Sequence, residues 1–345
     1  MSFQYERVVT DGSGLRLHLN ENTAGCSPAV VAAVQALTRQ DLATYPDYDA
    51  ASRACAAFLG VTTESLVLTN GLDEGILALA VAELRNGPVE TPFEAIVVVP
   101  AFDMYAACSD AAGGRVVEVP LEPGFAFPLD RVLERINGRT RIVWLTNPNN
   151  PTGQIIPRGA IARIAESAPD VVVMVDEAYA DFAGETLIGG PLLAARRNII
   201  VGRTFAKAHG LAGLRIGALV GHPGVLAAAR RVVPPYSVNA CVAAALPVAL
   251  GDTGYFRWYL DQVAESKALL YRALDERGIH YWKSAANFVL ARFDGDTAPL
   301  VRALAARGVH VRDRSADPGC DGCLRITAGV VEHTRALIAA LGASL

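Results

Sequence analysis

The sequence predicts an α/β fold in which a mostly parallel sheet is covered by helices on both faces. Short, continuous apolar runs recur through residues 29–248, and segments of helical length separate them. Strands buried on both faces show such continuous runs, because neither face meets water. After residue 251 one long helical stretch precedes several short strands, which predicts a smaller α+β layer.

The elements of the main layer follow in order. Ser27 is expected to cap, and Pro28 to open, a helix over residues 30–37. Asp47 is expected to cap a second helix that runs through residue 59 and ends at Gly60. Helices are also expected over residues 70–84 and after Asp103. Seven strands are predicted, at residues 66–69, 95–99, 116–119, 141–145, 171–175, 199–202 and 215–220.

The smaller layer is predicted to begin with a helix over residues 253–277. Four strands are expected after it, at residues 279–282, 288–293, 309–312 and 324–327, with helices at 299–307 and 331–341. We therefore divide the chain into an N-terminal arm (1–28) that joins the small domain, a large α/β domain (29–248) and a small C-terminal α+β domain (249–345).

The composition is that of a globular chain. Of 345 residues, 52% are hydrophobic and 19% charged, so a large core and roughly two domains are expected. The net charge is -4 and no basic block occurs, which argues against nucleic acid as a partner. The apolar runs are strand-sized, and the first residues lack the pattern of a signal peptide, so we expect no membrane partner and a cytoplasmic location.

Chemically active side chains follow several predicted strands, at the edge where open parallel sheets bind ligands. Segment 70–75 opens a helix directly after a strand, and its free backbone N–H groups could bind an anion; an ordinary capped turn explains it equally well. The run Asn-Pro-Asn-Asn-Pro-Thr-Gly at 147–153 forms a rigid loop, which places the amide of Asn150 at the same edge.

Asp176 ends a wholly apolar strand, so its carboxylate needs a cationic partner such as a protonated pyridine nitrogen, unless it only caps a helix. Tyr179 could donate to a phenolate oxygen on the same ring. Lys207 lies among small residues and could form a Schiff base with an aldehyde. Thr204 and Arg215 could hold a phosphate beside it. Together these groups match pyridoxal 5'-phosphate, although Lys207 alone would be read as a surface charge.

With these motifs the chain resembles a fold-type I pyridoxal-phosphate aminotransferase of class I/II, and most of all the histidinol-phosphate aminotransferase family. The resemblance implies a large domain around a mostly parallel seven-stranded sheet, with a small domain from the arm and the C-terminal part. The motifs that carry it are Leu-Asn-Glu-Asn at 19–22, Tyr-Pro-Asp at 45–47, Gly-Leu-Asp-Glu at 71–74, the run 147–153, Asp-Glu-Ala-Tyr at 176–179, the segment 204–217, Pro-Tyr-Ser-Val-Asn at 235–239, Asn-Phe-Val-Leu at 287–290, Val-Arg-Asp at 311–313 and Leu-Arg-Ile-Thr at 324–327.

The resemblance also implies roles for single residues. Lys207 would form the Schiff base and then move the proton between substrate and cofactor, Asp176 would pair with the pyridinium, and Tyr179 would hydrogen-bond the ring oxygen. The other expected cofactor contacts are Leu72, Asp73, Tyr105 (stacked on the ring), Asn150, Thr204, Arg215 and Tyr45. The expected substrate contacts are Arg325 (on the α-carboxylate), Asn20, Asn287 and Arg312. Tyr45 would come from a partner subunit, which implies a homodimer.

The expected reaction moves an amino group between an amino acid or amine and a 2-oxo acid by a ping-pong mechanism. Histidinol phosphate with 2-oxoglutarate is the leading pair. An aromatic amino acid aminotransferase and a lyase similar to threonine-phosphate decarboxylases are the alternatives. A non-catalytic cofactor-binding module is disfavoured, because the lysine is intact.

The chain departs from the family pattern at three positions. Ala24 stands where a pocket tyrosine is usual, Ala206 where a serine is usual, and His209 where Phe or Tyr is usual. The first change is expected to open the substrate pocket, and the second to remove one phosphate ligand. Cys320 and Cys323 form a Cys-x-x-Cys pattern that we interpret as a loop turning at residues 321–322, and no metal site is expected.

Overall fold

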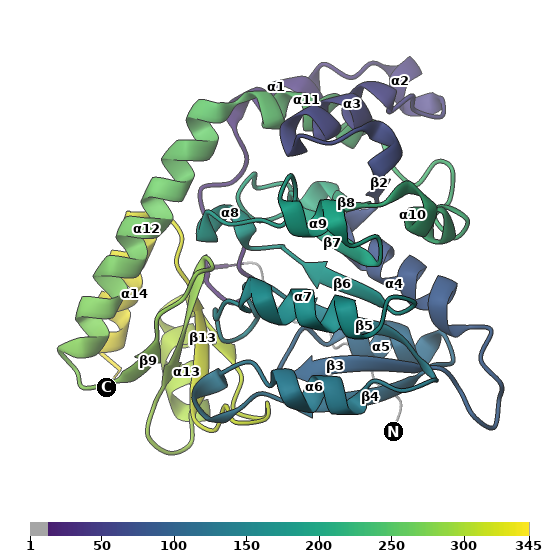
Figure 1. The fold of residues 1–345 in the computed structure, drawn as a ribbon. Coiled ribbons are helices and arrows are strands. Elements are labelled where there is room, and N and C mark those ends of the chain that lie inside the picture. The colour runs from purple at the N-terminus through teal and green to yellow at the C-terminus, as the bar shows by residue number, and fades with distance from the viewer. Residues whose placement is uncertain (1–12, 345) are drawn as a thin grey trace.

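A seven-stranded sheet forms the centre of the computed structural model, which describes residues 13–344 (Figure 1). Its strands are β2 (Leu66–Thr69), β3 (Glu94–Val99), β4 (Arg115–Pro120), β5 (Thr140–Thr146), β6 (Val172–Asp176), β7 (Ile199–Thr204) and β8 (Gly217–Gly221). They lie in the order β2-β8-β7-β6-β5-β3-β4. Only β8 is antiparallel to its neighbours, β2 and β7. The predicted α/β fold with a mostly parallel seven-stranded sheet is confirmed.

Two apolar layers bury the two faces of this sheet. Successive side chains on a strand point to opposite faces, so β5 directs Ile142 and Trp144 into one layer and Val143 and Leu145 into the other. The first layer is covered by α4 (Gly71–Leu84), α5 (Met104–Ala111) and α10 (Pro223–Arg230). The second is covered by α1 (Pro28–Gln35), α3 (Asp49–Leu59), α6 (Leu129–Arg135), α7 (Arg158–Ser167), α9 (Pro191–Ala195) and α11 (Ala240–Gly251).

The first two predicted helices begin near their expected capping residues, and the structure adds a third helix between them. The Ser27 hydroxyl accepts the Ala29 N–H at 3.2 Å at the start of α1. At the start of α3, Asp47 accepts the Asp49 N–H at 2.9 Å, although the N-cap residue is Tyr48 and not Asp47. The short helix α2 (Arg39–Ala43) was not predicted. A capping box stabilises its start, and none of its residues is buried. A helix without a buried face has no periodic apolar pattern in the sequence, and such a pattern is what predicts a helix.

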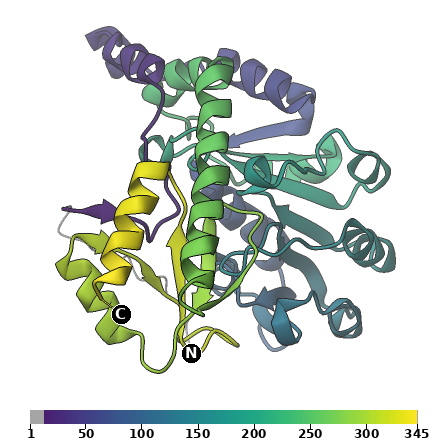
Figure 2. The same ribbon diagram turned by 90° about the vertical axis from the view of Figure 1, so that its left-hand side faces the viewer.

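The smaller layer is built from both ends of the described chain. A four-stranded antiparallel sheet has the order β12 (Arg312–Asp313), β13 (Cys323–Thr327), β10 (Phe288–Arg292), β9 (His280–Trp282). From the arm, β1 (Leu15–Arg16) pairs in parallel with β11 (Val309–His310). The long α12 (Thr253–Asp275) lies beside α14 (Val331–Gly342), as Figure 2 shows, and α13 (Ala298–Ala306) packs against β11. The domain boundaries after residues 28 and 248 remain a prediction.

Two predicted strands need correction. The strand expected over 309–312 is two strands, β11 and β12, which pair in different sheets. The strand expected from residue 215 begins at Gly217, because Arg215 has a φ of 57° and turns the chain before β8. The turn at 320–323 is confirmed, with the Cys323 N–H bonded to the Cys320 carbonyl at 2.8 Å.

The remaining short elements are α8 (Ala180–Ala183), η1 (Thr63–Ser65), η2 (Pro123–Phe125) and η3 (Ala212–Leu214). Between residues 13 and 344, none of the helices has both the length and the apolar character that crossing a membrane requires. In the same part of the chain, no three side chains of His, Cys, Asp or Glu gather as metal ligands would.

Candidate active site

A cavity of about 510 Å³ opens at the carboxyl ends of the parallel strands, between the main sheet, the arm and the smaller layer. Its size is that of an ordinary small-molecule site. Twelve of the predicted site residues line it: Asn20, Leu72, Asp73, Tyr105, Asn150, Asp176, Tyr179, Thr204, Lys207, Arg215, Arg312 and Arg325. Asn287 and Tyr45 are not on its wall.

Asp176 lies at the floor of the cavity, at the end of β6, and is only 4% exposed. Its Oδ1 accepts the Ala178 N–H at 2.8 Å, and its Oδ2 accepts the Tyr105 hydroxyl at 2.6 Å. Burial raises the pKa of Asp176 to about 6, while these two hydrogen bonds oppose the rise. A cationic ligand atom beside this carboxylate would therefore relieve a real desolvation cost.

Tyr105 supports Asp176 from behind. Its ring stacks on Trp144 with centroids 5.5 Å apart, and its hydroxyl also accepts a hydrogen bond from Thr146 at 3.1 Å. The expected stacking of Tyr105 on the cofactor ring stays a prediction. Phe102, half-buried on the same cavity wall, is an aromatic residue that the sequence analysis overlooked.

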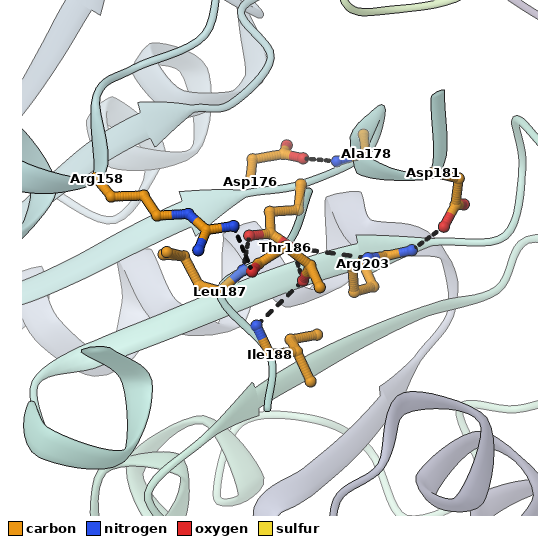
Figure 3. Close-up of polar contacts among 9 residues, drawn as sticks. Arg158, Asp176, Ala178, Asp181, Thr186, Leu187, Ile188 and Arg203 are labelled. Carbon is orange, nitrogen blue, oxygen red and sulfur yellow. Dashed lines mark hydrogen bonds and ion pairs between the residues drawn. The ribbon is translucent and has the colours of Figure 1, made fainter. Parts of the chain in front are cut away.

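A buried ionic network fixes the strand ends beneath the floor (Figure 3). Arg203, at 4% exposure, bonds the Asp181 carboxylate and lies 3.6 Å from the Glu177 carboxylate. Glu177 also accepts the Leu187 N–H at 2.7 Å and the Thr186 hydroxyl. Since Arg203 directly precedes Thr204 and Glu177 directly follows Asp176, the network ties β7 to β6 at the level of the cavity.

Lys207 projects into the cavity from the loop after β7. Its Nζ donates to the Leu19 carbonyl of the arm at 3.0 Å. Burial, with a further contribution from the positive charge of Arg325, lowers the pKa of Lys207 to about 8. The neutral amine that attacks an aldehyde is therefore accessible close to neutral pH.

The arm also reaches Tyr179 and Asn287. The Asn20 amide donates to the Tyr179 hydroxyl at 3.1 Å. Asn287, fully buried behind the cavity, donates to the Asn20 carbonyl at 3.1 Å. Asn287 thus reaches the cavity wall through Asn20, and its expected contact with the substrate stays a prediction.

Two arginines face the cavity from the smaller layer. Arg312 and Arg325 are directly opposite each other on the antiparallel strands β12 and β13, so their side chains leave the sheet on the same face. Arg325 donates to the Asn150 Oδ1 at 2.5 Å and to the His18 carbonyl at 2.6 Å. This pair makes one end of the cavity strongly positive.

The opposite end can hold a phosphate. Helix α4 begins here at Gly71, and the side chain of its N-cap residue, Asn70, makes no capping hydrogen bond, so the first N–H groups, those of Leu72 and Asp73 included, face an anion site without that cap. Gly71 has a φ of +75°, and a Cβ at this position would lie 2.5 Å from the Arg215 guanidinium. Arg215 pairs with the Asp73 carboxylate at 2.6 Å, and Thr204 lies on the same wall. Backbone donors, a hydroxyl and a guanidinium converge, which is the chemistry that a phosphate ester requires.

The three departures from the family pattern lie in different places. Ala206 lines the cavity, whereas Ala24 is exposed and outside its wall, so its opening of the pocket stays a prediction. His209 is buried among apolar side chains and stacks on Phe256 with centroids 4.7 Å apart. Burial lowers the pKa of His209 to about 4, so it is a neutral core residue and not a titrating group at the cofactor.

Comparison with known proteins agrees with this geometry. A sequence model described as aminotransferase class I and II matches residues 13–341. The chain belongs to the class I and II aminotransferases. A histidinol-phosphate aminotransferase 2 from Carboxydothermus hydrogenoformans is 37% identical over 93% of this chain and 88% of that protein.

Two solved structures share the fold of this aminotransferase. Aspartate aminotransferase from Thermus thermophilus with maleate has a TM-score of 0.80 at 25% identity, over 96% of this chain and 92% of the other. Histidinol-phosphate aminotransferase from Sinorhizobium meliloti in complex with pyridoxal-5'-phosphate has a TM-score of 0.86 at 24% identity, over 96% and 90%. The aminotransferase uses pyridoxal 5'-phosphate, and the phosphate-binding end and the lysine described above fit that cofactor.

Proposed function

We propose that this aminotransferase exchanges the amino group between histidinol phosphate and 2-oxoglutarate by a ping-pong mechanism. The observation that carries the substrate assignment is the pair Arg312 and Arg325, side by side on β12 and β13 in the cavity that holds Lys207. Both proposed substrates carry anionic groups, which guanidinium groups bind well. The name of the Carboxydothermus hydrogenoformans relative supports the same pair.

Five residues of the cavity would have separate roles in binding the cofactor, moving the proton and binding the substrate. Pyridoxal 5'-phosphate, when bound, supplies an aldehyde for amine attachment and a ring that withdraws electrons from the substrate α-carbon. Asp176 would hold the positive ring nitrogen, and Asn150 and Tyr179 would bind the ring oxygen. Lys207, with a pKa lowered to about 8, would accept and return the proton of the α-carbon. Arg325 would grip the α-carboxylate of the amino-acid donor as a fork.

A homodimer is part of this proposal. Tyr45 is 77% exposed and stacks on Tyr236 with centroids 4.3 Å apart, outside the cavity of its own chain. We propose that Tyr45 reaches the phosphate of a second copy. The test mixes chains carrying Tyr45→Ala with chains carrying Lys207→Ala. A mixed dimer then has one site with both changes and one intact site, so activity should reappear on mixing. Two inactive parents that stay inactive when mixed would contradict the shared site.

The substrate is tested by half-reactions of the cofactor-loaded enzyme. Glutamate and histidinol phosphate should each convert the absorbance of the lysine-bound cofactor to that of its amino form, and glutamate should release 2-oxoglutarate. Lys207→Ala is the matched blank. If glutamate and aromatic amino acids cause this conversion and histidinol phosphate does not, an aromatic amino acid is the substrate and the reaction is still an amino-group transfer. Carbon dioxide released from an amino-acid substrate would instead favour the lyase alternative. A cytoplasmic location remains part of the proposal.

A further inference from the structure

A buried imidazole faces the positive end of the cavity with no partner for its ring. His18 lies on the arm, lines the cavity and is only 2% exposed. Within residues 13–344, neither Nδ1 nor Nε2 of His18 has a hydrogen-bond partner. Leaving such a group buried and unpaired is costly, so a bound molecule that pairs with it gains the full benefit of the contact.

The groups around His18 define what that molecule can be. Arg16, His310, Arg312 and Arg325 face its ring, and His310 packs edge-on with centroids 5.9 Å apart. Arg16 already pairs with Glu21 at 2.7 Å. Arg312, in contrast, forms no hydrogen bond or ion pair with any other residue of the described chain. A cation is excluded from this position by charge, whereas an anion would meet an open guanidinium and an open imidazole together.

The ring carries no charge before a ligand enters. Burial, followed by the positive groups Arg16, His310, Arg312 and Arg325, lowers the pKa of His18 to about 4. Near neutral pH the imidazole therefore offers one N–H donor and one acceptor nitrogen. An anion placed beside it would stabilise the N–H donor and favour uptake of a second proton.

We propose that His18 determines substrate specificity by donating a hydrogen bond to the phosphate of a phosphate-monoester substrate, which Arg312 binds at the same time. The proposal deepens the assignment of histidinol phosphate and rests on it for the identity of the substrate. A phosphate monoester matches because its three oxygens can accept from an imidazole and a guanidinium at once. The His18 carbonyl, which binds Arg325, is a backbone group, so changes of the side chain leave that contact in place.

His209 provides a matched control. Both histidines are buried, burial lowers the pKa of each to about 4, and the Nε2 of each lacks a partner in the described chain. Only His18 lines the cavity. His209→Phe therefore tests the loss of a buried imidazole without touching the proposed phosphate contact.

The experiment uses the cofactor-loaded enzyme and phenyl phosphate, a phosphate monoester without an amine, as an inhibitor of the glutamate half-reaction. Phenylacetate serves as the carboxylate comparison. His18→Met should weaken inhibition by phenyl phosphate about tenfold and inhibition by phenylacetate far less, as expected for one lost bond to a charged group. His18→Gln, which keeps an N–H donor, should recover part of the loss, and His209→Phe should change neither constant.

A second measurement separates a ligand contact from a structural role. Because the His18 ring has no partner to lose, His18→Met should not lower the melting temperature of the ligand-free enzyme. A drop of more than about 4 °C would indicate a structural role and overturn the proposal. Unchanged inhibition by phenyl phosphate in His18→Met, or an equal loss for both inhibitors, would overturn it as well.

The outcome also separates this inference from the proposed substrate. For histidinol phosphate, His18→Met should raise KM about tenfold with little change in kcat, whereas histidinol should be unaffected. Should wild-type enzyme ignore histidinol phosphate while phenyl phosphate inhibition still depends on His18, the substrate assignment fails and the specificity role stands. If the enzyme turns over histidinol phosphate and substitution of His18 does not change that turnover, the substrate assignment stands and the specificity role of His18 fails.

Discussion

The hydroxyl of Tyr105 donates a hydrogen bond to the carboxylate of Asp176 over 2.6 Å, at the floor of the cavity. This bond opposes the rise in the Asp176 pKa that burial causes. The hydroxyl of a residue on helix α5 thus favours the ionised state of Asp176, on which pairing with the cofactor nitrogen depends.

Tyr105→Phe should weaken cofactor binding. Without the hydroxyl, the pKa of Asp176 rises further, and the carboxylate loses a hydrogen bond worth about 1.5 kcal/mol, which is roughly tenfold in affinity. The dissociation constant is measured by titrating the cofactor-free protein at pH 7. Tyr281→Phe, which removes an exposed bond to Asp275, is the control and should leave the constant unchanged. Equal affinity of wild type and Tyr105→Phe would contradict the role.

Asp176 should make the cofactor-free protein less stable as the pH rises. Its pKa is about 6 when folded and near 3.8 when unfolded, so the folded state binds more protons between these values. The free energy of unfolding therefore falls as pH increases from about 4 to about 6, by about 3 kcal/mol in all, and stays lowered above pH 6. Urea unfolding should show this loss in wild type but not in Asp176→Asn. Parallel pH profiles for the two proteins would refute the assignment.

Lys207 should be the lysine that the cofactor modifies. Borohydride reduction of the loaded enzyme should place the pyridoxyl group on Lys207, as read by peptide mass, and Lys207→Ala should lose the absorbance band. Lys267 is the internal control, because burial lowers its pKa to about 8 as well, but its Nζ donates to the Ser284 carbonyl outside the cavity. Labelling of both lysines would show that basicity, and not the cavity, selects the site.

Arg203 should matter for stability far more than an exposed arginine in an ion pair. Arg203→Met leaves Glu177 and Asp181 buried without their cation, which costs about 3 kcal/mol or more. Arg196→Met removes a pair with Glu166 at the surface and should cost less than about 1 kcal/mol. The free energies of unfolding in urea give the comparison. Similar losses for the two variants would mean that the network in Figure 3 is not coupled to the fold.

The sequence predicted best what side-chain type alone determines. Asp176 was placed correctly because a continuous apolar strand ends at it, and the segments after β5, β6 and β7 meet because parallel strands share one edge. The partner of Asp176 was not predicted. Tyr105 lies far away in the chain, and only the fold brings its hydroxyl to the carboxylate.

The contacts of the arm could not be predicted for a different reason. Three consecutive backbone carbonyls, those of His18, Leu19 and Asn20, accept hydrogen bonds from Arg325, Lys207 and Asn287. Every residue type has a backbone carbonyl, so these hydrogen bonds cannot be predicted from the residue types in the sequence. His18 was overlooked similarly, because an isolated histidine has no meaning until the surrounding arginines are known.

These three carbonyls have a consequence for engineering. Since the arm holds the lysine and the arginine through its main chain, the side chain at position 18 can be exchanged without removing those anchors. Substitutions at position 18 should therefore change which amine substrate the enzyme accepts while Lys207 and Arg325 stay in place. A library of variants at this single position would test substrate selectivity while Lys207 and Arg325 keep their hydrogen bonds to the arm.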